Sequence, residues 1–141
     1  MTTWFQKLTL GAGGMLALGI GAAIVIAPVS FYATYGISLE DDPNLLSELR
    51  APGANLAALG GLILVGVMRP SRFRFSAVLG ATVFLAYAFG RFMSMALDGM
   101  PTSGLVQATA IEFVIGVLCL AELTRGAAGT VNAPLQGPVH G

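Results

Sequence analysis

Four ionisable side chains stand in stretches of sequence that are otherwise apolar: Glu48, Arg50, Arg91 and Glu112. Ionisable groups are costly inside a bilayer, so their presence there marks a candidate functional site by default. A membrane-embedded carboxylate such as Glu112 is suited to acid/base chemistry, and a neighbouring arginine such as Arg91 to stabilising negative charge. Because no motif in the sequence fixes a reaction, the catalytic residues are unknown, and Glu112 and Arg91 are the candidates.

The elements that hold these charges must be transmembrane helices. Hydrophobic residues make up 55% of the 141 residues and charged residues only 10%, whereas a soluble domain carries about a quarter charged residues. Mean hydropathy is +0.80. Windows of about 20 apolar residues predict an all-α integral membrane four-helix bundle with helices at 8–28, 43–68, 75–97 and 105–123. These helices form one transmembrane domain, 1–125, and residues 126–141 are predicted to be a disordered cytoplasmic tail.

Two prolines shape the second helix. Asp42 followed by Pro43 supplies an N-cap and a first-turn proline, which predicts that the helix starts there. Pro52 lies inside the helix and cannot donate to the carbonyl of Glu48. A freed carbonyl is tolerated at membrane depth where it lines a cavity or meets a donor. A simple kink is the alternative interpretation of Pro52.

Several classes of site are excluded by residue counts. Cys119 is the one cysteine and lies in an apolar stretch, which excludes a disulfide framework and favours a buried packing thiol. His140 is the one histidine and belongs to the tail, so we expect neither a metal site nor a catalytic triad. Net charge is zero, and no basic stripe is present, which argues against nucleic acid. We expect no cofactor.

Orientation follows from the positions of the basic residues. Those outside the predicted helices all fall on one side of the bundle: Lys7, Arg69, Arg72, Arg74 and Arg125. The loop between the first two helices carries acidic charges only, and the positive-inside rule therefore predicts that both termini are cytoplasmic. Three aromatic residues of that loop would then lie at the outer membrane interface: Phe31, Tyr32 and Tyr35.

Small residues recur at helix-packing spacing in three rows: Gly13–Ala17–Gly21, Gly53–Ala57–Gly61 and Ala86–Gly90–Ser94. Such rows let helix backbones approach closely where lipid offers no hydrophobic driving force. We expect them to serve packing within one bundle, and a homodimer formed through a surplus row is the alternative.

The depths of the charges predict a specific ion pair. At about 1.5 Å per residue, Arg50, Arg91 and Glu112 all fall in the outer half of the membrane, with Glu48 near its outer boundary. Helical side chains lean toward the N-terminus of their own helix. Because the third helix runs outward and the fourth inward, Arg91 and Glu112 lean toward each other across a height gap of about 7 Å. Arg50 leans outward and is expected to snorkel.

Further polar side chains share a helix face with Arg91: Tyr87, Ser94 and Asp98, at i−4, i+3 and i+7. Together with the four charges they define a candidate ligand-binding site of Glu48, Arg50, Tyr87, Arg91, Ser94, Asp98 and Glu112. Structural alternatives stay open: a clasp for Arg91 and Glu112, depth control for Glu48 and Arg50, and an outer turn for Asp98. Glu122, near Arg125, is predicted to be a solvated end group.

Three motifs carry a resemblance to a known family. They are Glu48-Leu49-Arg50-Ala51, Gly90-Arg91 followed by Asp98-Gly99-Met100-Pro101, and Glu112 in the fourth helix. In their order and spacing they resemble the bacterial membrane family catalogued as domain of unknown function 4345. The resemblance covers the chain to about Arg125. It implies a small four-helix protein of the bacterial inner membrane, distantly similar to DoxX-like proteins, and it implies no activity.

Three classes of function remain. The first is a binding or accessory module whose polar outer-leaflet pocket holds a small amphiphile, or which docks on a larger membrane complex. The second is an enzyme acting on a lipid-soluble substrate, with Glu112 as acid/base and Arg91 as stabiliser. The third, a small transporter, ranks last because the first helix lacks the carboxylate that four-helix exporters carry there. Whether Arg91 and Glu112 line a cavity separates these classes.

Overall fold

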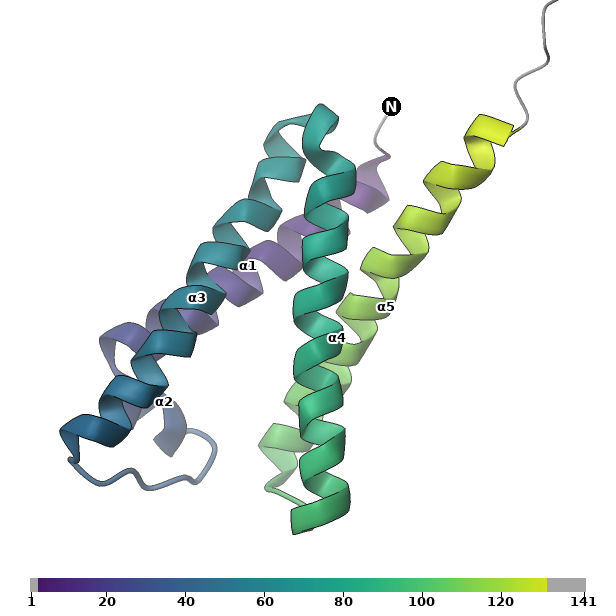
Figure 1. Ribbon diagram of the computed structural model, residues 1–141. Coiled ribbons are helices and arrows are strands. Elements are labelled where there is room, and N and C mark those ends of the chain that lie inside the picture. The colour runs from purple at the N-terminus through teal and green to yellow at the C-terminus, as the bar shows by residue number, and fades with distance from the viewer. Residues whose placement is uncertain (1–2, 132–141) are drawn as a thin grey trace, which may run out of the picture.

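The computed structural model describes residues 3–131, which form helices and their connections (Figure 1). The elements in chain order are α1 (Trp4–Ile26), α2 (Pro28–Ala33), α3 (Pro43–Met68), the 3-10 helix η1 (Pro70–Arg72), α4 (Phe73–Asp98) and α5 (Ser103–Val131). Four segments are long and apolar enough to cross a membrane: Trp4–Ile26, Pro43–Met68, Pro70–Asp98 and Ser103–Thr124. The chain is therefore a multi-pass membrane protein built as a four-helix bundle, as predicted.

Local capping explains where the first two long helices begin. Thr3 caps α1 through a capping box, in which the Gln6 amide N–H donates to Thr3 Oγ1 and the Thr3 N–H donates to Gln6 Oε1. This cap moves the start of α1 ahead of the predicted Leu8. Asp42 caps α3 by accepting from the Asn44 N–H at 3.0 Å, and Pro43 follows at the first helical position, which confirms the predicted start.

Two connections differ from the predicted pattern. The predicted first helix ran to Pro28, but α1 ends at Ile26, and Pro28 instead begins the short helix α2. A proline is well placed at a helix start, where its missing N–H would have no intrahelical partner. At the other end of the chain, α5 continues to Val131, past the boundary predicted at 125. The first proline after Arg125 is Pro134, so no proline ends the helix earlier. The rest of the predicted tail, 132–141, lies outside the described residues.

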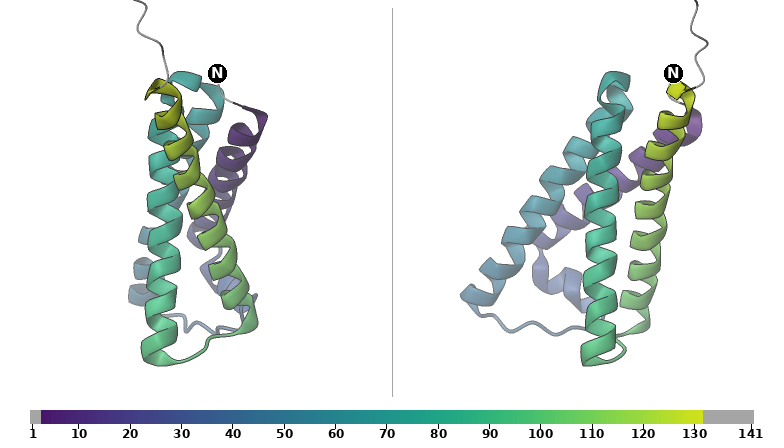
Figure 2. Two further views of the ribbon diagram at one scale, coloured as in Figure 1. Left: turned by 90° about the vertical axis from the view of Figure 1, so that its right-hand side faces the viewer. Right: turned by 45° about the vertical axis from the view of Figure 1, so that its right-hand side comes forward.

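The two ends of the bundle carry different connections, as both ribbon views show (Figures 1 and 2). The N-terminal end of α1, η1 and the C-terminal end of α5 lie together at what we call the η1 end. Helix α2 and the turn between α4 and α5 lie together at the opposite end, called the α2 end. This arrangement places the beginning of α1 and the end of α5 on the same side, as an even number of crossings requires.

Glycine contacts bring α1 and α3 together. These two helices form one extensive contact and α4 with α5 forms another. A Cβ added at Gly21 would overlap the backbone of Ala57, and one added at Gly60 would overlap the backbone of Leu18. Gly21 of the first predicted row and Gly53 of the second therefore serve packing within the bundle, whereas Gly61 of the second row faces open space. Gly60, which belonged to no predicted row, makes the close contact instead. Gly90 of the third row faces open space, so homodimerisation through that row stays a prediction.

Gly60 and its neighbour Gly61 offer a matched test of this packing. We expect Gly60→Ala to lower the free energy of unfolding by about 1–3 kcal/mol, because the added methyl group forces apart two helix backbones. Gly61 faces open space, so Gly61→Ala is the control and should leave stability unchanged or slightly raised. Reversible unfolding in mixed micelles measures both. Equal effects of the two variants would contradict the glycine-mediated contact.

Candidate functional site

Arg91 and Glu112 form the predicted ion pair between α4 and α5. Arg91 Nε donates to Glu112 Oε2 at 2.9 Å, and Arg91 Nη2 donates to Glu112 Oε1 at 3.3 Å. Both carboxylate oxygens therefore accept from one guanidinium, which is the bidentate geometry that arginine favours. The Glu112 side chain is only 10% exposed and that of Arg91 32%. The pair bridges the two helices in the half of the bundle toward the α2 end.

The pair also borders a cavity of about 300 Å³. Helices α1 to α5 all contribute to its wall, so the cavity lies inside the bundle and not on one helix face. Most of the lining is apolar: Ala17, Ile20, Ile24, Phe31, Ile37, Leu49, Pro52, Gly53, Leu56, Val83, Phe84, Leu105 and Ala108. The polar contribution comes from Tyr32, Tyr35, Tyr87, Arg91 and Glu112. Pro52 lies on this wall, but Glu48, whose freed carbonyl was predicted to line a cavity or meet a donor, is not among the lining residues.

Helix α2 and the residues after it close the cavity with aromatic side chains, whose predicted place was only the membrane interface. Phe31 packs edge-on against Tyr32 and Tyr35, with ring centroids 5.4 and 5.5 Å apart. The segment is held to the start of α5, where Thr102 Oγ1 donates to the Tyr35 carbonyl at 3.0 Å. The clustered spacing of Phe31, Tyr32 and Tyr35 after a helix-starting proline was the signal that could have indicated a packed turn.

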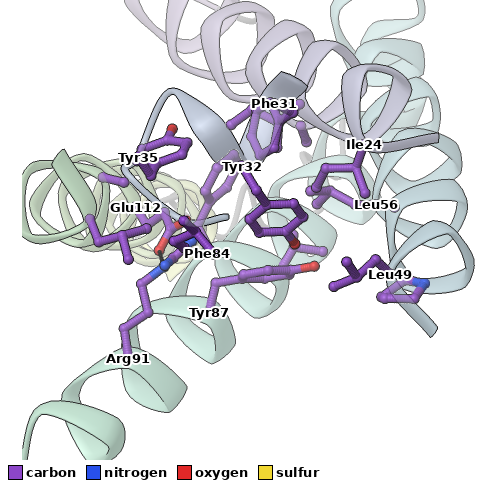
Figure 3. A pocket seen from close by; sticks show the side chains of 18 residues that line it. Ile24, Phe31, Tyr32, Tyr35, Leu49, Leu56, Phe84, Tyr87, Arg91 and Glu112 are labelled. Carbon is purple, nitrogen blue, oxygen red and sulfur yellow. Dashed lines mark hydrogen bonds and ion pairs between the residues drawn. The ribbon is translucent and has the colours of Figure 1, made fainter. Parts of the chain in front are cut away.

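The phenol groups of Tyr32 and Tyr87 converge on one side of the cavity (Figure 3). Figure 3 shows the Tyr32 and Tyr87 rings converging from α2 and α4, with both hydroxyls on the side of Leu49. The Arg91–Glu112 pair lies on the opposite side, and the Tyr35 hydroxyl points away from both groups. Burial raises the pKa of the Tyr32 phenol above its usual value, with the Arg91 guanidinium opposing the shift. The Tyr32 hydroxyl therefore stays protonated at neutral pH and is available as a donor.

Glu48 and Arg50 lie apart from this cavity. Both are exposed, and neither contributes to its wall. Arg50 Nε donates to the Val25 carbonyl at 3.1 Å, in the last turn of α1, where helix carbonyls lack intrahelical partners. Arg50 thus ties α3 to the end of α1. A ligand-binding role for these two residues stays a prediction.

Ser94 and Asp98 also lie away from the cavity. Ser94 Oγ donates to Asp98 Oδ2 at 2.9 Å on an exposed part of α4. They lie one and two turns beyond Arg91, in the last turns of α4, so about 5 and 10 Å of height along the helix separate them from Arg91. Of the seven predicted ligand-binding residues, the structure gathers Tyr87, Arg91 and Glu112 at one cavity. The role of the other four stays a prediction.

Glu122 corrects another expectation. It was predicted to be a solvated end group, yet it is 3% exposed and accepts a hydrogen bond from Gln6 Nε2 at 2.8 Å. The physical reason is that α1 crosses α5 at the η1 end and covers this carboxylate. Cys119, one turn earlier on α5, is buried as predicted. Across the described residues, no three histidine, cysteine, aspartate or glutamate side chains gather as a metal site would require.

Comparison with known proteins supports one relationship. The family model described as "Domain of unknown function (DUF4345)" matches residues 5–123, a range that includes the four predicted transmembrane helices and every residue of the cavity wall. No curated protein and no solved structure matches the chain.

The ion pair generates a testable prediction for stability. We expect Arg91→Gln or Glu112→Gln alone to lower the free energy of unfolding by about 2–3 kcal/mol, because each leaves a partly buried charge without its partner. The combined variant should recover part of that loss, giving a favourable coupling energy in a double-mutant cycle. Unfolding in mixed micelles measures all three variants.

Ser94→Ala serves as the control for this cycle, since it removes an exposed hydrogen bond on the same helix and should change stability by less than about 0.5 kcal/mol. Additive effects of the two single variants would show that Arg91 and Glu112 do not stabilise the bundle as a pair.

Proposed function

The chain belongs to the DUF4345 family of unknown function, and we propose that it is a bacterial inner-membrane binding protein whose cavity holds a small amphiphile. The observation that carries the proposal is the paired Arg91 and Glu112 in the wall of an otherwise apolar cavity of about 300 Å³. If the ion pair served only to hold α4 against α5, no cavity would be needed beside it.

The size and lining of the cavity support binding. Small-molecule sites measure about 300–1,000 Å³ and combine apolar walls with a few convergent polar groups. This cavity lies at the small end of that range and shows the same composition, with Tyr32 and Tyr87 added to the ion pair. It suits the apolar body of a small ligand or one segment of a longer lipid chain.

The geometry favours binding over catalysis by Glu112. Both of its carboxylate oxygens already accept hydrogen bonds from Arg91. A substrate that needed Glu112 as acid/base would have to displace the guanidinium from at least one of them. A ligand that is only bound requires no such displacement, because it can contact the pair from the cavity side.

The proposal places the cavity in the outer half of the membrane. The basic residues Arg69, Arg72 and Arg74 lie in and beside η1, so the positive-inside rule puts the η1 end in the cytoplasm. The α2 end, with the cavity, then faces the outside. A ligand would therefore come from the outer leaflet of the inner membrane.

Filling the cavity tests the binding function. We expect Ala108→Phe to abolish saturable photolabelling of cavity residues by a medium-chain ketone that carries a diazirine, because the added ring occupies the ligand volume. The full-length protein in nanodiscs is irradiated with the probe, and labelled positions are found by mass spectrometry.

Ala110→Phe is the matched control, since Ala110 lies on the same helix but is exposed and should leave labelling of the cavity intact. Equal labelling of cavity residues in both variants, or no saturable labelling in the parent protein, would overturn the proposal.

Orientation is tested separately with introduced cysteines. In a Cys119→Ala background, we expect Ser71→Cys to react with a membrane-impermeant maleimide only from the cytoplasmic side, because η1 carries the basic residues. Ser38→Cys, in the connection between α2 and α3, should react only from the periplasmic side. Both positions are exposed. The reverse pattern would invert the topology and place the cavity in the inner leaflet.

A further inference from the structure

The charge balance of the cavity restricts its ligand. Arg91 and Glu112 are the charged side chains in its wall, and they neutralise each other through two hydrogen bonds. A charged ligand would either bring an unmatched charge into a medium of low dielectric constant or break the pair and strand one partner. The cavity is therefore suited to an uncharged molecule.

The hydrogen-bonding groups of the wall that the ion pair leaves unused are mainly donors. A guanidinium has five N–H donors, and Glu112 takes two of those of Arg91. The hydroxyls of Tyr32 and Tyr87 lie together on the side of Leu49 (Figure 3), and neither one hydrogen-bonds to any side chain or backbone group in the part of the chain that the structure describes. Tyr87 is 38% exposed and Tyr32 is half-buried, so both hydroxyls are accessible to a ligand. A ligand oxygen that accepts from these two hydroxyls gains hydrogen bonds that the apolar part of the wall does not offer.

The rest of the wall requires that the body of the ligand be apolar. Ile20 and Ile24 of α1, Leu56 of α3 and Phe84 of α4 offer only apolar contacts, so hydrogen-bonding atoms on that part of the ligand would lose their water without gaining a partner. Polar groups are thus needed at one region of the ligand and are unfavourable elsewhere.

We infer that the cavity selects an uncharged amphiphile with an apolar body and a hydrogen-bond-accepting carbonyl or hydroxyl oxygen, and that Tyr32 and Tyr87 are specificity-determining residues. The inference rests on the proposed binding function, because it assigns a ligand class to the same cavity. It excludes fatty acids, long-chain amines and plain alkanes as preferred ligands.

A matched probe series tests the ligand class. Four diazirine probes of one chain length differ only in their polar group, which is a ketone, a carboxylic acid, an amine or, in the alkane, absent. Their saturable labelling of the full-length protein in nanodiscs is compared at neutral pH. We expect the ketone to bind about tenfold or more tightly than the acid and the amine and about fivefold more tightly than the alkane. Equal labelling by all four, or preference for the acid, amine or alkane, overturns this inference and leaves the binding function standing. No saturable labelling by any probe overturns both.

Phenylalanine substitutions test the two tyrosines without changing the shape of the cavity. Tyr32→Phe with Tyr87→Phe should weaken ketone binding by about fivefold or more and leave alkane binding unchanged. Thr124→Val is the control, because it removes a hydroxyl from an exposed position near the η1 end of α5 that is not part of the cavity wall. If the double variant binds the ketone as the parent does, these residues do not determine specificity.

Neutralising one partner of the ion pair should redirect the selectivity. Glu112→Gln leaves the Arg91 charge uncompensated in the wall, so the carboxylic acid probe should overtake the ketone and should raise the melting temperature of this variant. The amine should gain nothing. An unchanged preference for the ketone in a folded Glu112→Gln variant would contradict the role assigned to charge balance.

Discussion

Pairing of Glu112 with Arg91 is the constraint on which the cavity end of this protein depends. A lone carboxylate at membrane depth is costly, and the cost falls only when a partner supplies charge and directional hydrogen bonds together. Arg91 supplies both, at 2.9 and 3.3 Å. The contact fixes the rotation of α4 relative to α5, since neither helix can turn without separating the charges. It also leaves the local charge at zero, which sets what else the site can hold.

The cavity follows from how the two helix pairs are joined. Gly21 and Gly60 let α1 and α3 touch along their backbones. Helices α4 and α5 meet through Gly80 against Cys119, Gly116 against Leu85, and the ion pair. The pairs diverge from η1 toward the α2 end (Figures 1 and 2). At the α2 end, no transmembrane helix in the described part of the chain fills the space between the α1–α3 pair and the α4–α5 pair. Helix α2 covers it with Phe31 and Tyr32 instead, and aromatic rings on a short helix leave a residual volume.

Sequence patterns predicted what depends on local composition. Hydropathy and the Asp42–Pro43 cap gave α3 its observed bounds, and the opposite lean of side chains on antiparallel helices was enough to pair Arg91 with Glu112. Helix α2 was not predicted, because six residues are too few for a periodic signal and its position depends on tertiary contacts. Ser94 and Asp98 were grouped with Arg91 because spacing of i+3 and i+7 places them near the same helix face, but it does not show where along that face the bundle encloses a cavity. Both residues lie in the last turns of α4, beyond the cavity, and are exposed there.

Two buried carboxylates on α5 show why charge alone does not define the site. Glu112 and Glu122 are 7% and 3% exposed, and both accept hydrogen bonds from another helix. Glu122 accepts a hydrogen bond from Gln6 of α1 and lies one turn from the buried Cys119, so its contacts serve to hold α1 against α5. Glu112 borders open volume with further donors around it. The same helix thus carries one carboxylate enclosed by packing and one that faces a cavity. Since only the second leaves room for another molecule, the cavity, and not the buried charge, distinguishes a binding site from a structural contact.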